Sequence, residues 1–201
     1  MNTEDHPDPT AAAAWQHLCT HSARSVANAC ERAGILSIPD YYGEDPRLGL
    51  YRVVVGQQVS TQAASAMFAD LMQRANHNNA QLLALLRSDA PTKLSQTKRA
   101  TLTYLAGLPD AQIAQWLALD YPQRTQAMTQ TRGVGPWTVA MWSMFVCKDA
   151  DVWSQGDLVL RRQADVFASQ DNRVASDIVA EAAPYRTYFA LLCWQLADTK
   201  R

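Results

Sequence analysis

A Gly133-Val134-Gly135 turn separates two stretches of the chain that both have the composition of helices. Glycine has no Cβ and permits a tight turn, and Pro136 follows where the first turn of a helix tolerates proline. Bare backbone amides at the start of that helix can hold a phosphate without reading any base. The turn therefore predicts a helix-hairpin-helix that grips DNA, although a short motif of this kind is more often only a turn.

The remaining sequence also favours helix over sheet. Glycine accounts for 8 of 201 residues, while alanine, glutamine and leucine, which are good helix formers, dominate long stretches. Apolar spacing and capping signals predict helices over about 11–33, 61–74, 80–87, 96–105, 111–119, 122–130, 136–147, 158–168, 174–183 and 184–198. The continuous apolar run over 48–55 fits a strand or a buried helix by its periodicity, and we predict a helix because its surroundings are helical. The expected N-caps include Ser60, Asn79, Ser95, Asp110 and Asp157. We predict an all-α protein whose residues 1–10 form a flexible tail.

Composition narrows the classes of function. The net charge of −1 leaves DNA binding open, because a duplex binder needs only a local basic face. The sequence has neither a signal-peptide start nor a long apolar stretch, so we expect a soluble, cytoplasmic protein with no membrane partner. The four cysteines, Cys19, Cys30, Cys147 and Cys193, lack the spacing of metal ligands. We therefore predict neither an iron–sulfur cluster nor a zinc site.

A second motif lies downstream of the hairpin. Residues 133–145 read GVGPWTVAMWSMF and residues 152–162 read VWSQGDLVLRR, with Asp157 at the head of a predicted helix. This combination resembles the helix-hairpin-helix DNA glycosylase superfamily, and within it the 3-methyladenine DNA glycosylase II (AlkA-type) family. Three further segments agree with that family in the same order: 54–60 (VVGQQVS), 94–98 (LSQTK) and 184–186 (PYR).

The resemblance implies a fold and a domain organisation. Residues 11–201 are expected to form a single glycosylase unit of two helical lobes. One lobe would comprise about 45–130, and the other 11–44 together with 131–201. The active cleft would lie between the two lobes.

Asp157 is the candidate catalytic residue. Hydrolysis of a purine's glycosidic bond passes through an oxocarbenium-like state, which a carboxylate beside the sugar can stabilise while it orients or deprotonates a water. An aspartate at the head of a helix is also an ordinary N-cap. Its separation from the hairpin favours catalysis, and the two roles can coexist.

Trp137 occupies the position at which bifunctional members of the superfamily carry a lysine nucleophile. An indole cannot form a Schiff base, so the resemblance implies a monofunctional enzyme that uses water and leaves an abasic site. Trp137 and Trp194 also match tryptophans of the family's base pocket, which would hold a flipped, positively charged base by stacking and cation–π attraction. Met141 stands where family members can have tyrosine, which leaves the damage spectrum open. Core packing is the alternative for both tryptophans.

The DNA contacts follow from the same resemblance. The backbone of Gly133, Val134 and Gly135 would hold a phosphate. The expected helpers are the cationic side chains of Lys98, Arg132, Arg161 and Arg186, for each of which solvated surface charge is the alternative. The Gln57-Gln58 pair lies near the wedge that fills the gap after base flipping, and Gln58 is polar at that position. An ordinary cap or loop glutamine is the alternative for Gln58. A monovalent cation, Na⁺ or K⁺, would be held by the backbone carbonyls of Thr129, Thr131 and Val134.

We therefore predict a monomeric, monofunctional DNA glycosylase of base excision repair that requires no cofactor. Its substrates would be alkylated purines such as 3-methyladenine and 7-methylguanine in double-stranded DNA. Two alternatives stay open: a bifunctional glycosylase with lyase activity, and a helix-hairpin-helix module that binds DNA without catalysis.

Overall fold

The computed structural model describes residues 9–40 and 45–199, and over these ranges the chain is helical without any strand. The all-α prediction is therefore confirmed. No helix in these ranges is long and apolar enough to cross a membrane. The chain divides into two compact units, one of Asp40–Cys147 and one formed by the segments up to Pro39 and from Lys148 onward.

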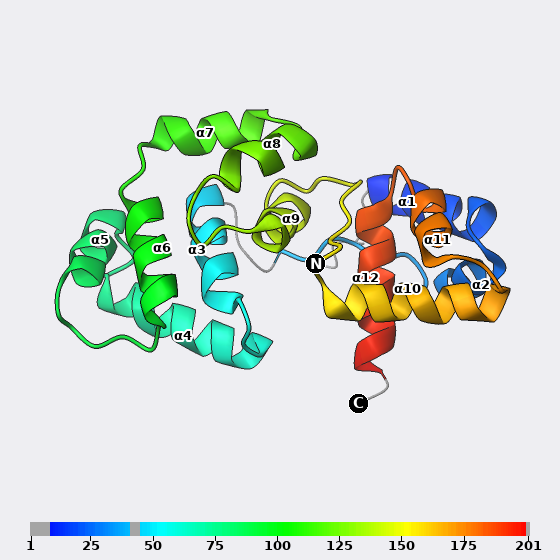
Figure 1. Cartoon of the computed structure of the whole chain (residues 1–201), viewed down its shortest axis with the longest axis horizontal. Coiled ribbons are helices and arrows are strands. Elements are labelled where there is room, and N and C mark those ends of the chain that lie inside the picture. Colours follow the sequence, from blue (N-terminus) through cyan, green and yellow to red (C-terminus); the bar gives the residue numbers. More distant parts are fainter. Residues whose placement is uncertain (1–8, 41–44, 200–201) are drawn as a thin grey trace, which may run out of the picture. The chain divides into compact units, whose positions relative to one another are not determined.

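The central unit, Asp40–Cys147, is built from helices α3 to α9 in its described part (Figure 1). They are α3 (Pro46–Gly56), α4 (Thr61–Arg74), α5 (Asn79–Arg87), α6 (Gln96–Ala106), α7 (Asp110–Ala118), α8 (Tyr121–Met128) and α9 (Pro136–Phe145). Every residue from Thr138 to Phe145 is buried, so α9 is the core helix of this unit. Trp142 anchors it by donating from Nε1 to the carbonyl of Pro46 at 2.8 Å.

The terminal unit combines the two ends of the chain. Its helices are α1 (Pro9–His21), α2 (Arg24–Ala33), α10 (Leu158–Asp171), α11 (Ala175–Glu181) and α12 (Arg186–Asp198). Helix α12 packs across α10, and α1 packs against α2 (Figure 1). The core forms around Phe189, which stacks on Trp153 with ring centroids 5.4 Å apart and also meets Phe167.

The single helix predicted over 11–33 is in fact two helices, α1 and α2. Ala23 has extended backbone angles, and the chain turns back there so that both halves bury their apolar faces. Trp15 can thereby donate from its indole nitrogen to the carbonyl of Cys30 at 3.2 Å. A continuous helix would hold these residues about 22 Å apart. The start also differs, because α1 begins at Pro9 inside the predicted tail, of which residues 1–8 lie outside the described ranges.

Two predicted caps are wrong by one residue. Asn78, rather than Asn79, caps α5 by accepting from the amide of Gln81, while Asn79 is used in a buried network described below. Pro109 stands at the N-cap of α7, and Asp110 is the first helical residue. The lobe boundary predicted at about residue 130 also differs from the structure, because α9 packs on α3 and α8 and so belongs to the central unit.

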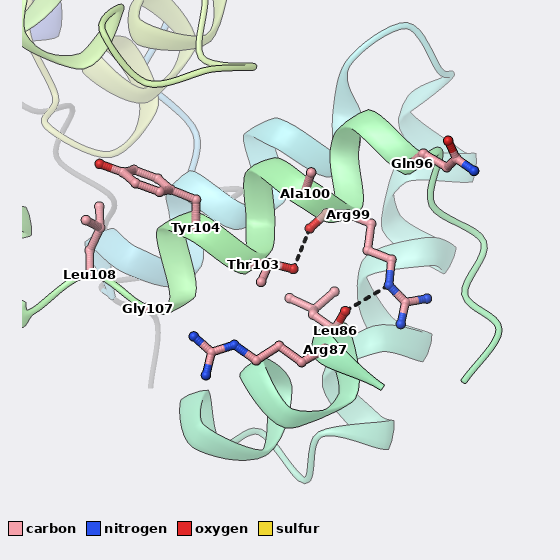
Figure 2. Close-up of a pocket in the computed structure, with 9 residues that line it drawn as sticks. All are labelled: Leu86, Arg87, Gln96, Arg99, Ala100, Thr103, Tyr104, Gly107 and Leu108. Atoms are coloured by element: carbon pink, nitrogen blue, oxygen red, sulfur yellow. Dashed lines mark hydrogen bonds between the residues drawn. The ribbon is translucent and has the colours of Figure 1, made fainter. Parts of the chain in front are cut away.

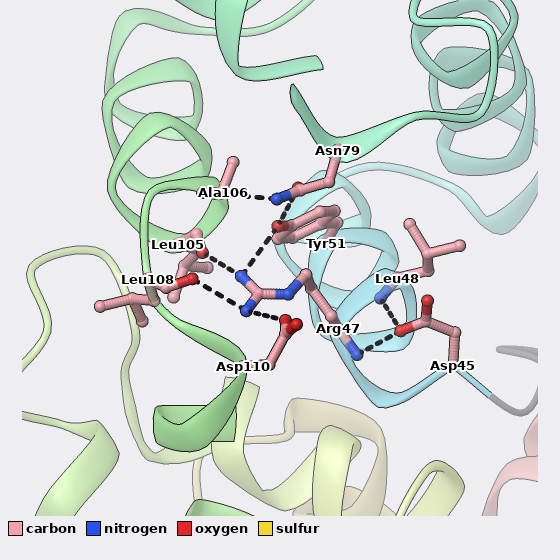
Figure 3. Close-up of polar contacts among 9 residues, drawn as sticks. All are labelled: Asp45, Arg47, Leu48, Tyr51, Asn79, Leu105, Ala106, Leu108 and Asp110. Carbon is pink, nitrogen blue, oxygen red and sulfur yellow. Dashed lines mark hydrogen bonds and ion pairs between the residues drawn. The ribbon is translucent and has the colours of Figure 1, made fainter. Parts of the chain in front are cut away.

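Buried Arg47 joins α3 to the end of α6 (Figure 3). Its guanidinium donates to the carbonyls of Leu105 and Leu108, each at 2.9 Å, and to Asp110 at 2.8 Å. Arg47 is 7% exposed, whereas the Asp110 side chain is fully exposed. The carbonyl contacts therefore contribute the larger part of the stabilisation, because an exposed ion pair is screened by water.

Two further hydrogen bonds extend this network to α5. Tyr51 donates from its hydroxyl to Asn79 Oδ1 at 2.8 Å, and the Asn79 amide donates to the carbonyl of Ala106 at 3.0 Å. Burial raises the pKa of Tyr51, so the phenol stays protonated as a donor. The carbonyls at the C-terminal end of α6, which no intrahelical amide satisfies, are thus paired by side chains from α3 and α5.

We predict that Arg47→Met lowers the free energy of unfolding by about 2–4 kcal/mol, because it removes the guanidinium that donates to the carbonyls of Leu105 and Leu108 in a buried setting. Asp110→Asn is the matched control and should leave the urea midpoint unchanged. Equal destabilisation by the two variants in urea titrations would show that the exposed ion pair, and not the carbonyl contacts, carries the network.

Candidate functional site

The predicted hairpin is present between α8 and α9. Helix α8 ends at Met128 and α9 begins at Pro136. Gly133 has a φ of +86°, the left-handed region that favours glycine, and the amide of Val134 donates to the carbonyl of Thr131 at 3.0 Å. Gly135 is the N-cap of α9, and no side chain caps the first amides of this helix. The turn therefore presents backbone at the positive end of a helix, which suits an anion.

Side chains from two other helices hold this turn in place, and we call them the hairpin clamp: Thr101 of α6 and Gln57 at the end of α3. Thr101 Oγ1 lies 3.2 Å from the carbonyl of Arg132, and its one hydroxyl proton is shared between this carbonyl and that of Thr97 in its own helix, at 2.9 Å. Gln57 donates from Nε2 to the carbonyl of Gly133 at 3.0 Å and to Thr138 Oγ1 at 2.8 Å. The hairpin carbonyls are thereby turned toward the protein interior and paired there.

Thr101 also explains the glycine at position 133. A Cβ placed on Gly133 would collide with Oγ1 of Thr101 and lie 3.0 Å from its Cβ. A Cβ on Gly135 would meet nothing within 4 Å. The first glycine is therefore required by close packing as well as by its backbone angles, whereas the second is not.

The predicted DNA-binding pair Gln57-Gln58 divides into two roles. Gln57 is half-buried and belongs to the hairpin clamp. Gln58 is exposed and has a φ of 55°, an uncommon conformation for a residue with a side chain. Such strain is typical of residues that the surrounding structure holds for a function. That Gln58 fills the gap left by a flipped base stays a prediction.

Lys98 of α6 supports the end of α3, just before Gln57 and Gln58. Its Nζ donates to the carbonyl of Val55 at 2.8 Å, near the C-terminal end of α3, and burial lowers its pKa. A cation is stabilising at that end of a helix. Lys98 therefore positions the segment that carries Gln57 and Gln58, and its ammonium has further donors for the predicted phosphate contact.

Asp157 is the N-cap of α10, as predicted. Its Oδ1 accepts from the amides of Val159 at 2.9 Å and Leu160 at 3.1 Å. Burial raises the pKa of the Cys193 thiol on α12, and the negative charge of Asp157 adds to that rise. The half-buried carboxylate is thus fixed in orientation and lies near the part of α12 that carries Trp194.

The connector that leads to Asp157 is fixed to the start of α12 by Thr187. Thr187 is fully buried, donates from Oγ1 to the carbonyl of Asp149, and accepts from the amide of Val152 at 3.1 Å. Its own amide donates to the carbonyl of Ala150 at 3.0 Å. The segment before Asp157 is therefore held without regular secondary structure.

Arg186 reinforces this attachment. Its guanidinium forms a bidentate pair with Asp151, with Nε to Oδ1 at 2.6 Å and Nη2 to Oδ2 at 2.7 Å. These hydrogen bonds hold the pKa of Asp151 below its ordinary value. Arg186 was predicted to help bind a phosphate, and the structure gives it a structural partner within the protein.

The remaining predicted site residues are distributed over the two units. Trp137, Met141 and Arg132 belong to the central unit, with Met141 buried, Trp137 half-buried and Arg132 exposed. Trp194 and Arg161 belong to the terminal unit, where Trp194 is half-buried and Arg161 exposed. The predicted base pocket combines residues of both units and stays a prediction.

More than nine-tenths of the chain is similar in fold to solved 3-methyladenine DNA glycosylases. The Mag1 3-methyladenine DNA glycosylase of Schizosaccharomyces pombe, in complex with abasic DNA, matches with a TM-score of 0.76 at 22% identity, over 92% of this chain and 97% of that chain. The DNA-3-methyladenine glycosidase of Bacillus halodurans matches with 0.73 at 23% identity, over 91% and 88%. This is the fold of the 3-methyladenine DNA glycosylases.

A third glycosylase with this fold, the 3-methyladenine DNA glycosylase of Archaeoglobus fulgidus, has a TM-score of 0.74 at 14% identity, covering 94% of this chain and 70% of that chain. No family model matches the sequence, and no curated protein matches it either. In the described residues, no group of three or more His, Cys, Asp or Glu side chains could hold a metal ion.

Three residues of the site were not identified from the sequence. Thr101, Thr138 and Thr187 are buried hydroxyls that fix the hairpin and the connector. Each hydroxyl has a hydrogen-bond partner that lies far away in the sequence, so no local sequence pattern indicates its role. A threonine on the apolar face of a predicted helix is a weak signal of such a contact, because a buried hydroxyl needs a hydrogen-bond partner.

We predict that Gly133→Ala lowers the free energy of unfolding by about 3 kcal/mol, because it adds a steric clash with Thr101 to a left-handed backbone. Gly135→Ala is the control, at a site with open space, and should cost at most about 1 kcal/mol. Urea unfolding followed by circular dichroism measures both. Equal stability of the two variants would mean that Thr101 does not constrain the turn.

Proposed function

We propose that this protein is a monofunctional DNA glycosylase that removes alkylated purines from double-stranded DNA. The observation that carries the proposal is the clamped hairpin, in a chain that has the fold of 3-methyladenine DNA glycosylases. Its backbone would hold one phosphate and so place the damaged nucleotide. One solved neighbour was determined with abasic DNA, which is the product expected of such a reaction.

Asp157 would provide the catalytic carboxylate. Its negative charge stabilises the positive charge that develops on the sugar as the glycosidic bond breaks, and it orients the attacking water. The hydrogen bonds to Val159 and Leu160 hold the carboxylate still, so little reorganisation is needed during the reaction. Capping and catalysis are then two uses of one fixed side chain.

Trp137, Trp194 and Met141 would form the base pocket. The two tryptophans are half-buried, so part of each indole is accessible, as a stacking surface requires. An electron-rich ring attracts a base that carries a positive charge after alkylation. Met141 is buried and apolar where family members can have tyrosine, which favours recognition by shape over a hydroxyl hydrogen bond.

The phosphate contacts would be shared between the hairpin backbone and exposed cations. Arg132 lies within the turn, and Arg161 lies in the first turns of α10. The carbonyl of Thr129, at the C-terminal end of α8, and the carbonyls of Thr131 and Val134 supply oxygen atoms of the kind that Na⁺ and K⁺ prefer. A cation held there would neutralise the carbonyl end of α8 beside the DNA phosphate.

A bifunctional glycosylase is the second candidate, and one observation favours it. Burial lowers the pKa of Lys98, and a lysine with a lowered pKa is the kind that forms a Schiff base. Against this, the Nζ of Lys98 donates to the carbonyl of Val55. Trp137, rather than lysine, stands in the second helix of the hairpin.

We predict that Asp157→Asn lowers the single-turnover rate of base release from alkylated duplex DNA by about 10²–10³-fold. Asparagine is as good an N-cap as aspartate, so folding and DNA affinity should be retained. The control is Asp165→Asn, which removes an exposed carboxylate from the same helix and should leave the rate unchanged.

Three results would contradict parts of this proposal. Base release that persists in Asp157→Asn would remove this residue from catalysis. DNA binding without any base release by the wild type would indicate a binding module. Borohydride trapping of a covalent DNA adduct, lost in Lys98→Gln, would indicate the lyase.

A further inference from the structure

The exposed side of α6 forms a ridge beside the hairpin. Gln96, Ala100 and Tyr104 follow one another at four-residue spacing and are all exposed, and we call them the α6 ridge. Tyr104 is 54% exposed, which is unusual for so large a ring. All three residues line hollows on both flanks of the helix.

The two hollows differ in what lies across them. One, of about 510 Å³, is bounded on its far side by the hairpin residues Thr131 and Arg132. The other, of about 640 Å³, is bounded by Arg87 at the end of α5 and by Gly107 (Figure 2). The surface therefore runs without interruption from the hairpin across the ridge to Arg87.

The chemistry of this surface matches a nucleic-acid backbone. Hydroxyl and amide side chains line both hollows, three arginines border them, and no carboxylate is among their lining residues. This is notable in a chain that carries 19 acidic against 18 basic residues. Arginine, threonine, glutamine and tyrosine are residue types that contact phosphate and sugar.

The arginines of this surface are not equivalent. Arg99 is committed to the fold, since its guanidinium donates to the carbonyls of Leu86 and Ala90 at 2.9 and 2.8 Å. Arg87 instead extends along the hollow, with Nη2 beside Gly107 (Figure 2). Arg87 and Tyr104 are both exposed, and their side chains reach the surface on opposite flanks of the hollow.

We propose that duplex DNA held at the hairpin continues over the α6 ridge, with phosphates of one strand in the two hollows, contacted by Tyr104 and Arg87. This inference rests on the proposed function, because the hairpin must first hold DNA. Crossing one helix with its side chains takes about 10 Å. That corresponds to about three base pairs of duplex at 3.4 Å each, so Arg87 contacts DNA well outside the damaged site.

The test compares two duplexes that both carry a tetrahydrofuran abasic-site analogue at the centre. One is about 25 base pairs long, and the other is so short, about 7 base pairs, that it ends near the hairpin contact. Binding of wild type, Arg87→Gln, Tyr104→Phe and the control Arg32→Gln is measured by fluorescence anisotropy as a function of salt. Arg32 is an exposed arginine of α2 in the terminal unit.

For the long duplex, Arg87→Gln should weaken binding about threefold to fivefold and reduce the salt slope by about 0.9, the value of one phosphate contact. Tyr104→Phe should weaken binding less and leave the salt slope unchanged, because it removes a neutral donor. Neither variant should change binding of the short duplex, and Arg32→Gln should match wild type on both.

The failures of the two proposals are distinguishable. If wild type binds both duplexes and Arg87→Gln matches it on the long one, the α6 ridge does not contact DNA and the proposed function stands. If wild type binds neither duplex, the proposed function is overturned and this inference with it. Thermal unfolding of each variant, expected to be unchanged, separates lost contacts from lost folding.

Discussion

The close approach of Thr101 to Gly133 is the contact on which the candidate site depends. It brings the middle of α6 against the turn between α8 and α9, where only a residue without a Cβ fits. Gln57 completes the arrangement from the end of α3. Because α6 and α3 both hold the turn that joins α8 to α9, the backbone that would face DNA is fixed in place, and little entropy remains to be lost when a phosphate binds.

In the terminal unit, the connector before Asp157 is also held in place by side chains from a packed helix. The connector before Asp157 has no regular hydrogen-bond ladder of its own, so its backbone groups need partners elsewhere. Thr187, at the start of α12, supplies them. The adjacent Arg186 holds the connector through the side-chain carboxylate of Asp151. The carboxylate of Asp157 is then fixed by the helix that it caps. In both units a polar side chain on a packed helix positions a functional loop, which agrees with catalytic and binding residues lying on loops held by a rigid scaffold.

The sequence was sufficient for the helical class, the hairpin and the caps at Ser60, Ser95 and Asp157, because each depends on residues close together in the chain. It was insufficient for the break between α1 and α2 at Ala23. No glycine or proline marks a turn there, and the break arises from tertiary packing of the two helices. The same limit applies to Gln57, whose partner Gly133 is far away in the sequence. A glutamine at a loop can equally face DNA or brace a turn, and only the fold distinguishes the two. Arg186 is similar, since its pairing with Asp151 depends on how the connector is folded back.

The central claim is that the clamped hairpin and Asp157 serve the excision of alkylated purines. Mass spectrometry of the free bases released when the protein is incubated with methylated duplex DNA tests it most directly. The account predicts release of 3-methyladenine and 7-methylguanine, with the abasic strands left uncut. The absence of every methylated purine from the released fraction, under conditions in which the protein binds the DNA, would contradict it.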